Sequence, residues 1–136
     1  MCLRKGNTVT WQSKRQGTVA LSTAEAETMA AVQAAKEGIW ISDLLLQLKI
    51  EVGLPLKIMV DNKSTIQILK NPVSHYRTKH MGIQTQFVRE LVEEGTFEFH
   101  YVPTEFQVAD ILTKALAPAK VDKALKMLGL FELKQN

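Results

Sequence analysis

The chain has 136 residues, a formal net charge of +3 at pH 7 and a hydrophobic content of 46%. These values predict one small globular domain whose core needs neither a metal ion nor a disulfide. Cys2 is the single cysteine, which excludes an internal disulfide and cysteine-rich zinc modules. No apolar stretch approaches the roughly 20 residues of a membrane-spanning helix. We therefore expect an intracellular protein, in the cytoplasm or the nucleus, with no membrane as a partner.

The first third of the chain predicts a hairpin followed by a long helix. Alternation of apolar and polar residues predicts strands over 1–4 and 8–14. Ser22 and Glu25 have the spacing of a capping box, which predicts a helix from Thr23 to about Leu48. Its large apolar residues at near-helical spacing are Met29, Val32, Trp40, Ile41, Leu44, Leu45 and Leu48. Its alanines allow close approach to a packed neighbour.

Shorter helices and strands are predicted for the rest of the chain. They are a strand over 55–60, helices over 63–70 and 79–94, a strand over 97–102, a helix begun by a capping box at 104–107, and a last helix over 120–128. This order favours an α/β fold, with helices covering a mixed sheet, over a bundle or a sandwich. Four aromatic residues are assigned to the core rather than to a base-stacking surface: Trp11, Trp40, Phe97 and Phe99.

Three acidic residues stand at positions where ligands often bind. Glu27 lies on the alanine-rich side of the long helix, Asp61 follows an apolar strand, and Asp110 lies in the first turns of a predicted helix. Each has an alternative structural role: a first-turn helix acid, a helix cap, and a solvated side chain near Lys114. If the three converge, their mutual repulsion favours a bound cation, and their hard oxygen ligands suit Mg²⁺ or Mn²⁺.

Five blocks of sequence carry a family resemblance. They are the residues at 11–16 (WQSKRQ), 21–27 (LSTAEAE), 60–64 (VDNKS), 77–80 (RTKH), and 101–105 (YVPTE) with 109–114 (ADILTK). In order and spacing these blocks resemble the ribonuclease H domain of copia-type retrotransposon Pol polyproteins. The resemblance implies a ribonuclease-H-like mixed sheet flanked by helices. It also implies hydrolysis of the RNA strand of RNA–DNA hybrids with two divalent ions.

The resemblance also implies roles for the three acids. Glu27, Asp61 and Asp110 match the family's catalytic, metal-binding carboxylates, and Glu25 is the alternative for the helix position. A fourth carboxylate, an aspartate on the first and central strand, has no counterpart, since no Asp precedes Asp43. We therefore expect weak or no hydrolysis by this chain alone. Two Mg²⁺ or Mn²⁺ ions are implied, or at most one weakly bound ion if nothing replaces that aspartate.

The resemblance also sets the expected domain limits. Residues 1–116 are interpreted as a ribonuclease-H-like domain that lacks its first, central strand, and residues 117–136 as a C-terminal helical extension of the same domain. Gly82 is a second departure, because relatives usually carry an acid there.

Basic residues indicate a nucleic-acid partner. The segment 63–89 contains five Lys and Arg residues and no acid. Phosphate contacts of this kind bind a duplex with little sequence preference, and we expect an RNA–DNA hybrid as the partner. The candidate contacts are Lys14, Arg15, Lys63, Arg77, Lys79 and His80. The alternative is a solvated helical surface.

Two other functions remain open at this point. The chain is either a catalytically inactive nucleic-acid-binding module or an interaction module that packs on a reverse transcriptase domain or on a second copy of itself. The missing aspartate favours the former, and an open strand edge favours the latter. The three histidines have no metal-ligand spacing, so no zinc site is expected.

Overall fold

The computed structural model describes residues 2–4, 7–13, 20, 22–71 and 79–130. The chain divides into two compact units, one of Thr18–Val102 and one of Met1–Gly17 together with Pro103–Asn136. The domain limits implied by the resemblance, at 116 and 117, stay a prediction.

Two parallel strands form the sheet of the first unit. β3 (Leu56–Val60) pairs with β4 (Phe97–Tyr101), so that Leu56 lies opposite Phe97 and Val60 opposite Tyr101. A 2.9 Å hydrogen bond closes each end of the pair, from Leu56 N to Thr96 O and from Val102 N to Val60 O. Both strands agree with the ranges expected from the sequence to within one residue.

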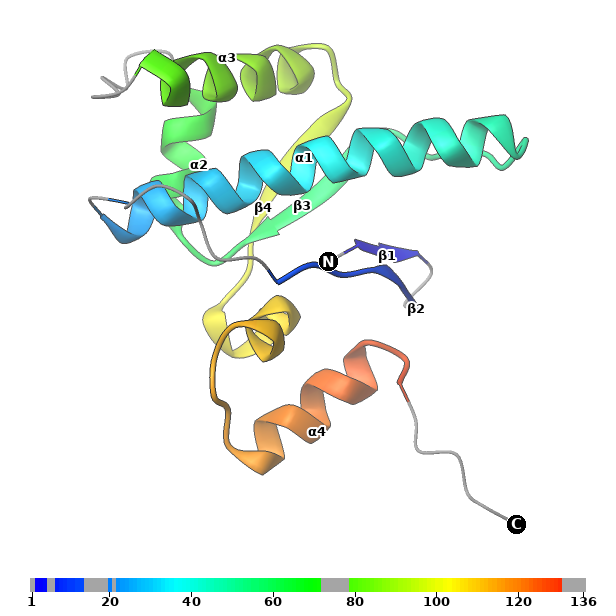
Figure 1. Cartoon of the computed structure of the whole chain (residues 1–136), viewed down its shortest axis with the longest axis vertical. Helices are drawn as coiled ribbons and strands as arrows, with labels where there is room; N and C mark the ends of the chain where they lie inside the picture. Colours follow the sequence, from blue (N-terminus) through cyan, green and yellow to red (C-terminus); the bar gives the residue numbers. More distant parts are fainter. Residues whose placement is uncertain (1, 5–6, 14–19, 21, 72–78, 131–136) are drawn as a thin grey trace. The chain divides into compact units, whose positions relative to one another are not determined.

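Three helices pack on the β3–β4 sheet. They are α1 (Thr23–Gln47), α2 (Lys63–Lys70) and α3 (Lys79–Glu93), and α1 runs across the two strands (Figure 1). Parallel strands need a crossover connection, which α2 and α3 supply. The buried members of the core are Ala31, Val32, Ala35, Val60, Leu69, Val88, Phe97 and Phe99. All three helices confirm the sequence prediction, and Phe97 and Phe99 are core residues as expected.

Small side chains, rather than the largest ones, line the buried face of α1. The buried residues of α1 are Thr28, Ala31, Val32, Ala35 and Ile41. Trp40 is 57% exposed, and Leu44 and Leu48 are exposed as well. The prediction that Trp40 belongs to the core is therefore wrong. Alanine allows α1 to approach the sheet and its helical neighbours closely, and the larger residues fall outside that contact.

Local signals explain the limits of the helices. The Ser22 hydroxyl accepts a hydrogen bond from Glu25 N–H at 3.1 Å, which confirms the N-cap expected for α1. Beyond α3, Gly95 has φ +76°, a left-handed conformation that glycine adopts without steric cost. Gly95 therefore turns the chain from α3 into β4.

The second unit contains a hairpin. β1 (Cys2–Arg4) and β2 (Asn7–Thr10) pair antiparallel, which confirms the expected hairpin, although β2 ends four residues before the predicted limit. Trp11 lies just beyond the last paired residue of β2 and is 67% exposed, so its assignment to the core is wrong. The Thr8 hydroxyl donates a 3.3 Å hydrogen bond to Leu128 O, which ties β2 to the end of the last helix.

The capping box expected at 104–107 does not begin an α-helix. The segment forms two 3-10 helices, η1 (Thr104–Phe106) and η2 (Val108–Leu112), and neither has a side-chain cap. The next α-helix, α4, spans Pro118–Met127. Pro118 is its first residue rather than a separator before it, since proline suits that position and forces Ala117 into an extended conformation.

The described residues form a mixed α/β structure, as expected from the element order. Their strands make two separate two-stranded sheets, β1–β2 and β3–β4. The ribonuclease-H-like sheet stays a prediction. Within the part of the chain that the structure covers, no helix has the length and apolar character to cross a membrane.

Candidate functional site

The carboxyl edge of the β3–β4 sheet, defined here as residues 60–63 and Tyr101, carries the first candidate acid. Asp61 directly follows β3 and is half-buried. The helix cap here is its neighbour Asn62, whose Oδ1 accepts hydrogen bonds from Ser64 N (2.9 Å) and Thr65 N (3.3 Å). The alternative role of Asp61 as a cap is therefore wrong. Its carboxylate makes no ion pair or side-chain hydrogen bond with any residue that the structure describes.

Buried threonines join the beginning of α1 to the beginning of α2. The hydroxyls of Thr28 and Thr65 both donate to the carbonyl oxygen of Ala24, at 2.7 Å and 3.2 Å. Both side chains are fully buried. The segment that carries Glu27 is thus fixed against the helix that follows Asp61. These two acids belong to neighbouring parts of one unit.

Glu25 and Glu27 are both half-buried on α1. Residues two apart on a helix point roughly 200° apart, so the two side chains face different surroundings. The backbone of Glu25 takes part in the N-cap with Ser22, and Glu27 follows on the next turn. Glu27 stays the predicted helix carboxylate, with Glu25 as the alternative.

Asp110 belongs to the other unit, in η2 rather than in an α-helix. Its Oδ2 lies 2.8 Å from Lys114 Nζ, and its side chain is only 14% exposed. The alternative interpretation correctly expected Lys114 beside Asp110. It was wrong to expect a solvated Asp110 side chain, because that side chain is largely enclosed. Convergence of Asp110 with Glu27 and Asp61 stays a prediction.

Metal-ligand geometry is limited in the described part of the chain. No group of three or more His, Cys, Asp or Glu side chains there is close enough to hold an ion. Asp61 and Glu27 stay predicted ligands of a divalent cation; Mg²⁺ is often held by one or two carboxylates, with water and substrate phosphate as the other ligands.

Lys63 and Tyr101 form a pair that the sequence did not predict. Lys63 Nζ lies over the ring of Tyr101, 4.9 Å from its centroid. Tyr101 ends β4 and Lys63 begins α2, so the pair flanks Asp61 at the carboxyl edge. The alternation of residues in β4 indicated only which face of the strand Tyr101 lies on. The parallel register, with Tyr101 opposite Val60, brings Tyr101 close to the start of α2.

The other basic residues predicted to contact nucleic acid lie in different parts of the chain. Lys79 and His80 are the first two residues of α3. Lys14, Arg15 and Arg77 lie outside the described residues. An added Cβ at Gly82 would meet no atom within 4 Å, so an acid would fit there without repacking.

Arg89 corrects the picture of a continuous basic surface over 63–89. Its side chain is only 7% exposed, and its Nη2 donates a 2.7 Å hydrogen bond to Ile68 O near the end of α2. The guanidinium therefore satisfies a helix carbonyl in the interior rather than facing phosphate. Nothing in the spacing of the basic residues distinguished Arg89 from its exposed neighbours.

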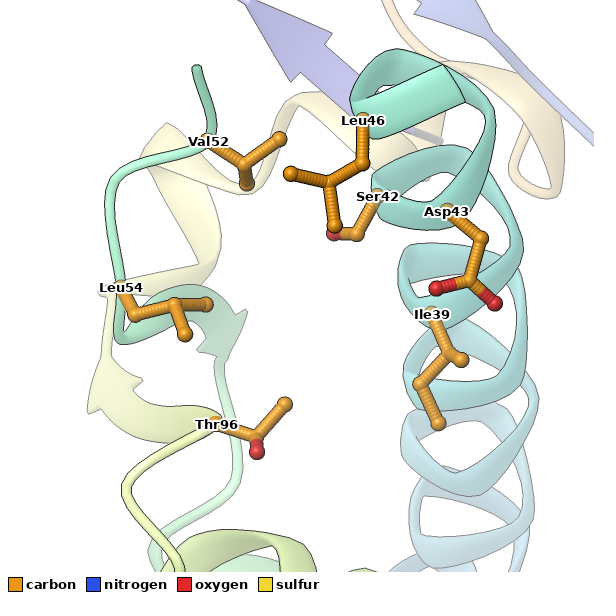
Figure 2. A pocket seen from close by; sticks show the side chains of 7 residues that line it. All are labelled: Ile39, Ser42, Asp43, Leu46, Val52, Leu54 and Thr96. Atoms are coloured by element: carbon orange, nitrogen blue, oxygen red, sulfur yellow. The ribbon is translucent and has the colours of Figure 1, made fainter. Parts of the chain in front are cut away.

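An apolar pocket of about 240 Å³ lies at the opposite end of the sheet. Figure 2 shows α1 on one side and the segments before β3 and β4 on the other. Its lining residues are Ile39, Ser42, Asp43, Leu46, Val52, Leu54 and Thr96. It offers one carboxylate and no cation, so it lacks the charges that would bind a phosphate.

Sequence comparisons place the chain among transposon proteins. It is 36% identical over 128 residues to the retrovirus-related Pol polyprotein from transposon TNT 1-94 of Nicotiana tabacum, a match that covers 92% of this chain and 9% of that protein. The homologues of this chain are retrovirus-related Pol polyproteins. Those from transposons RE2 and RE1 of Arabidopsis thaliana are 33% and 34% identical, over 92% and 90% of the chain.

The chain spans 8–9% of the length of these Pol relatives. The predicted similarity to Pol polyproteins of transposons is confirmed. The names do not specify a ribonuclease H domain, which stays a prediction. No family model matches the chain, and no solved structure matches it significantly.

Proposed function

We propose that the chain is the ribonuclease H domain of a copia-type retrotransposon Pol polyprotein, which hydrolyses the RNA strand of RNA–DNA hybrids. The observation that carries the proposal is the state of Asp61: a half-buried carboxylate at the carboxyl end of β3 that neither caps α2 nor pairs with a described cation. Ligands of α/β sheets bind at this edge. A carboxylate kept there without a structural role suits a divalent ion.

The proposed roles divide between the acids and the basic residues. Asp61 and Glu27 hold Mg²⁺ or Mn²⁺, and Asp110 completes the set. When bound, the divalent ions activate the attacking water and stabilise charge on the leaving oxygen. Lys63 binds a backbone phosphate of the hybrid next to Asp61. We expect cleavage by this chain to be slow, because it has no counterpart of the first-strand aspartate that bridges two ions in the family.

An inactive module that binds nucleic acid, or that packs on a reverse transcriptase domain, is the second candidate. It is favoured by the exposed Lys63 ammonium, which can contact a phosphate without any metal ion. This candidate shares the basic surface with the first and differs only in lacking cleavage.

Cleavage of a labelled RNA–DNA hybrid in Mg²⁺ and in Mn²⁺ tests the proposal. We expect slow cleavage by the parent chain and a further loss of about 100-fold or more in Asp61→Asn and Glu27→Gln, since each removes charge stabilisation at the reacting phosphate. Asp43→Asn is the matched control, because it makes the same chemical change on an exposed residue of α1. Glu25→Gln tests the alternative assignment of the helix carboxylate.

The other possible results of the cleavage assay distinguish the two candidate functions and test the assignment of the site. A parent that binds the hybrid without cleaving it favours the inactive module. Equal cleavage by Asp61→Asn and the parent contradicts the assignment of the site. Rapid turnover by the parent that Asp61→Asn abolishes contradicts only the expected impairment, and it shows that another group replaces the missing aspartate.

A further inference from the structure

Tyr101 is an aromatic residue of the sheet that is not part of its core. It lies on the same face of β4 as Phe97 and Phe99, at the end of that series, and those two rings are 2% and 4% exposed. The Tyr101 ring is 47% exposed. Its side chain makes no hydrogen bond with any residue that the structure describes, and the Lys63 ammonium is its one recorded side-chain partner there. Packing alone does not account for an aromatic ring at this position.

Lys63 forms no ion pair with another residue that the structure describes. Those residues include Asp61, which lies two residues before it in the chain. The Lys63 ammonium lies over the Tyr101 ring instead. A cation on an aromatic face keeps its full charge and most of its hydrogen-bonding capacity, so Lys63 can still bind an anion.

The ring also restricts the lysine. A free lysine side chain has high rotational entropy, and immobilising such a side chain opposes binding. Contact with a ring at the end of a hydrogen-bonded strand limits the ammonium to one region beside Asp61. The entropy of that restriction is lost during folding and not again when a ligand binds.

We propose that Tyr101 is a positioning residue that holds the Lys63 ammonium for contact with a backbone phosphate of a bound nucleic-acid strand. The inference rests on the proposed function, because it uses the same edge of the sheet. It adds one residue, Tyr101, whose ring positions the lysine for the phosphate contact proposed above. Since phosphate contacts carry no base information, Tyr101 strengthens binding without sequence preference.

A double-mutant cycle on hybrid binding tests this role. Affinity for a labelled RNA–DNA hybrid is measured in EDTA over a range of salt concentrations, so that no cleavage occurs. Tyr101→Leu should weaken binding about two- to five-fold, the effect expected of one solvent-exposed cation–π contact. Tyr101→Phe should bind like the parent, because it keeps the ring.

The second arm of the cycle removes the charge. Lys63→Gln should reduce the slope of log K against log salt by about 0.9 if one phosphate contact on a B-form duplex is lost, and by a similar amount on the hybrid. In the Lys63→Gln background, Tyr101→Leu should have no further effect, since Tyr101 acts through Lys63. Lys49→Gln is the matched control, because it removes the same charge from an exposed residue after α1.

The outcomes separate this inference from the proposed function. A parent that does not bind the hybrid overturns both. A parent that binds, with Tyr101→Leu binding equally well or losing affinity equally in both backgrounds, overturns the positioning role alone. If Tyr101→Leu fails to fold by circular dichroism, Tyr101→Gln replaces it, because a polar side chain suits this half-exposed position.

Discussion

The two edges of the β3–β4 sheet differ in almost every chemical property. The carboxyl edge presents Asp61, Asn62 and the Lys63–Tyr101 pair. The amino edge, defined here as residues 54–56, 96 and 97, contains the buried ring of Phe97 and borders the apolar pocket beneath α1 (Figure 2). α1 connects them, with hydrogen-bonded threonine at its beginning and apolar residues toward its end.

This difference separates stability from function within one small unit. At the amino edge, the Phe97 ring is buried, and the described residues that line the adjacent pocket include no cation for a phosphate to contact. At the carboxyl edge, Asn62 caps α2, and neither Asp61 nor Lys63 forms an ion pair with another residue that the structure describes. Substitutions at the first edge should therefore change folding, and substitutions at the second should change binding or cleavage.

Two aromatic residues at opposite ends of β4 give the largest expected contrast. Phe97→Ala should lower the free energy of unfolding by about 3–5 kcal/mol, because it leaves a cavity under α1. Tyr101→Leu should lower it by less than about 1 kcal/mol, because that ring is half-exposed. Urea unfolding of both variants measures the contrast. Equal losses would show that Tyr101 is a core residue in solution.

Adjacent residues at the carboxyl edge give the next contrast. Asn62→Ala should cost about 0.5–2 kcal/mol, since it removes the N-cap of α2. Asp61→Asn should change stability by no more than about 0.5 kcal/mol, because the carboxylate has no partner among the described residues. Thermal unfolding of the two variants checks this. A large loss in Asp61→Asn would reveal a structural role and weaken the assignment of a metal ligand.

Two helical glycines provide a third contrast. A Cβ at Gly38 would lie 3.0 Å from the Phe97 ring, whereas a Cβ at Gly82 would meet nothing within 4 Å. Gly82→Ala should gain about 0.5–1 kcal/mol from helix propensity. Gly38→Ala should lose up to about 2 kcal/mol, because overpacking exceeds the same gain. Equal stabilisation by both variants would mean that the amino edge has room to adjust.

Much of the fold was predictable because local signals set it. The Ser22–Glu25 capping box located the start of α1, apolar spacing located α2 and α3 to within a residue, and alternation located β4. The segment at 104–115 was not predictable in the same way. Its capping pattern was present, but no side chain caps η1 or η2, and Pro118 restricts the chain that follows.

The sequence predicted the acidic residues of the candidate site but not the residues that surround them. Motif spacing selected Asp61, but only the structure shows that Asn62 is the cap. Burial of Arg89 and exposure of Trp40 depend on which elements pack together, which periodicity along one helix does not encode. Contacts between distant residues, such as Lys63 with Tyr101, follow from the register of β3 and β4 and therefore required the fold.

Because β3 and β4 are far apart in the sequence, β3 is synthesised well before the strand that pairs with it. A ribosome that adds about 5–20 residues per second needs roughly 2–8 s to cover the roughly 40 residues between Val60 and its partner Tyr101. During that interval β3 lacks its partner β4. α1 precedes β3 in the chain, so its alanine face is already available for the nascent strand to pack against. The long helix thus protects an unpaired strand from other nascent chains until β4 is made.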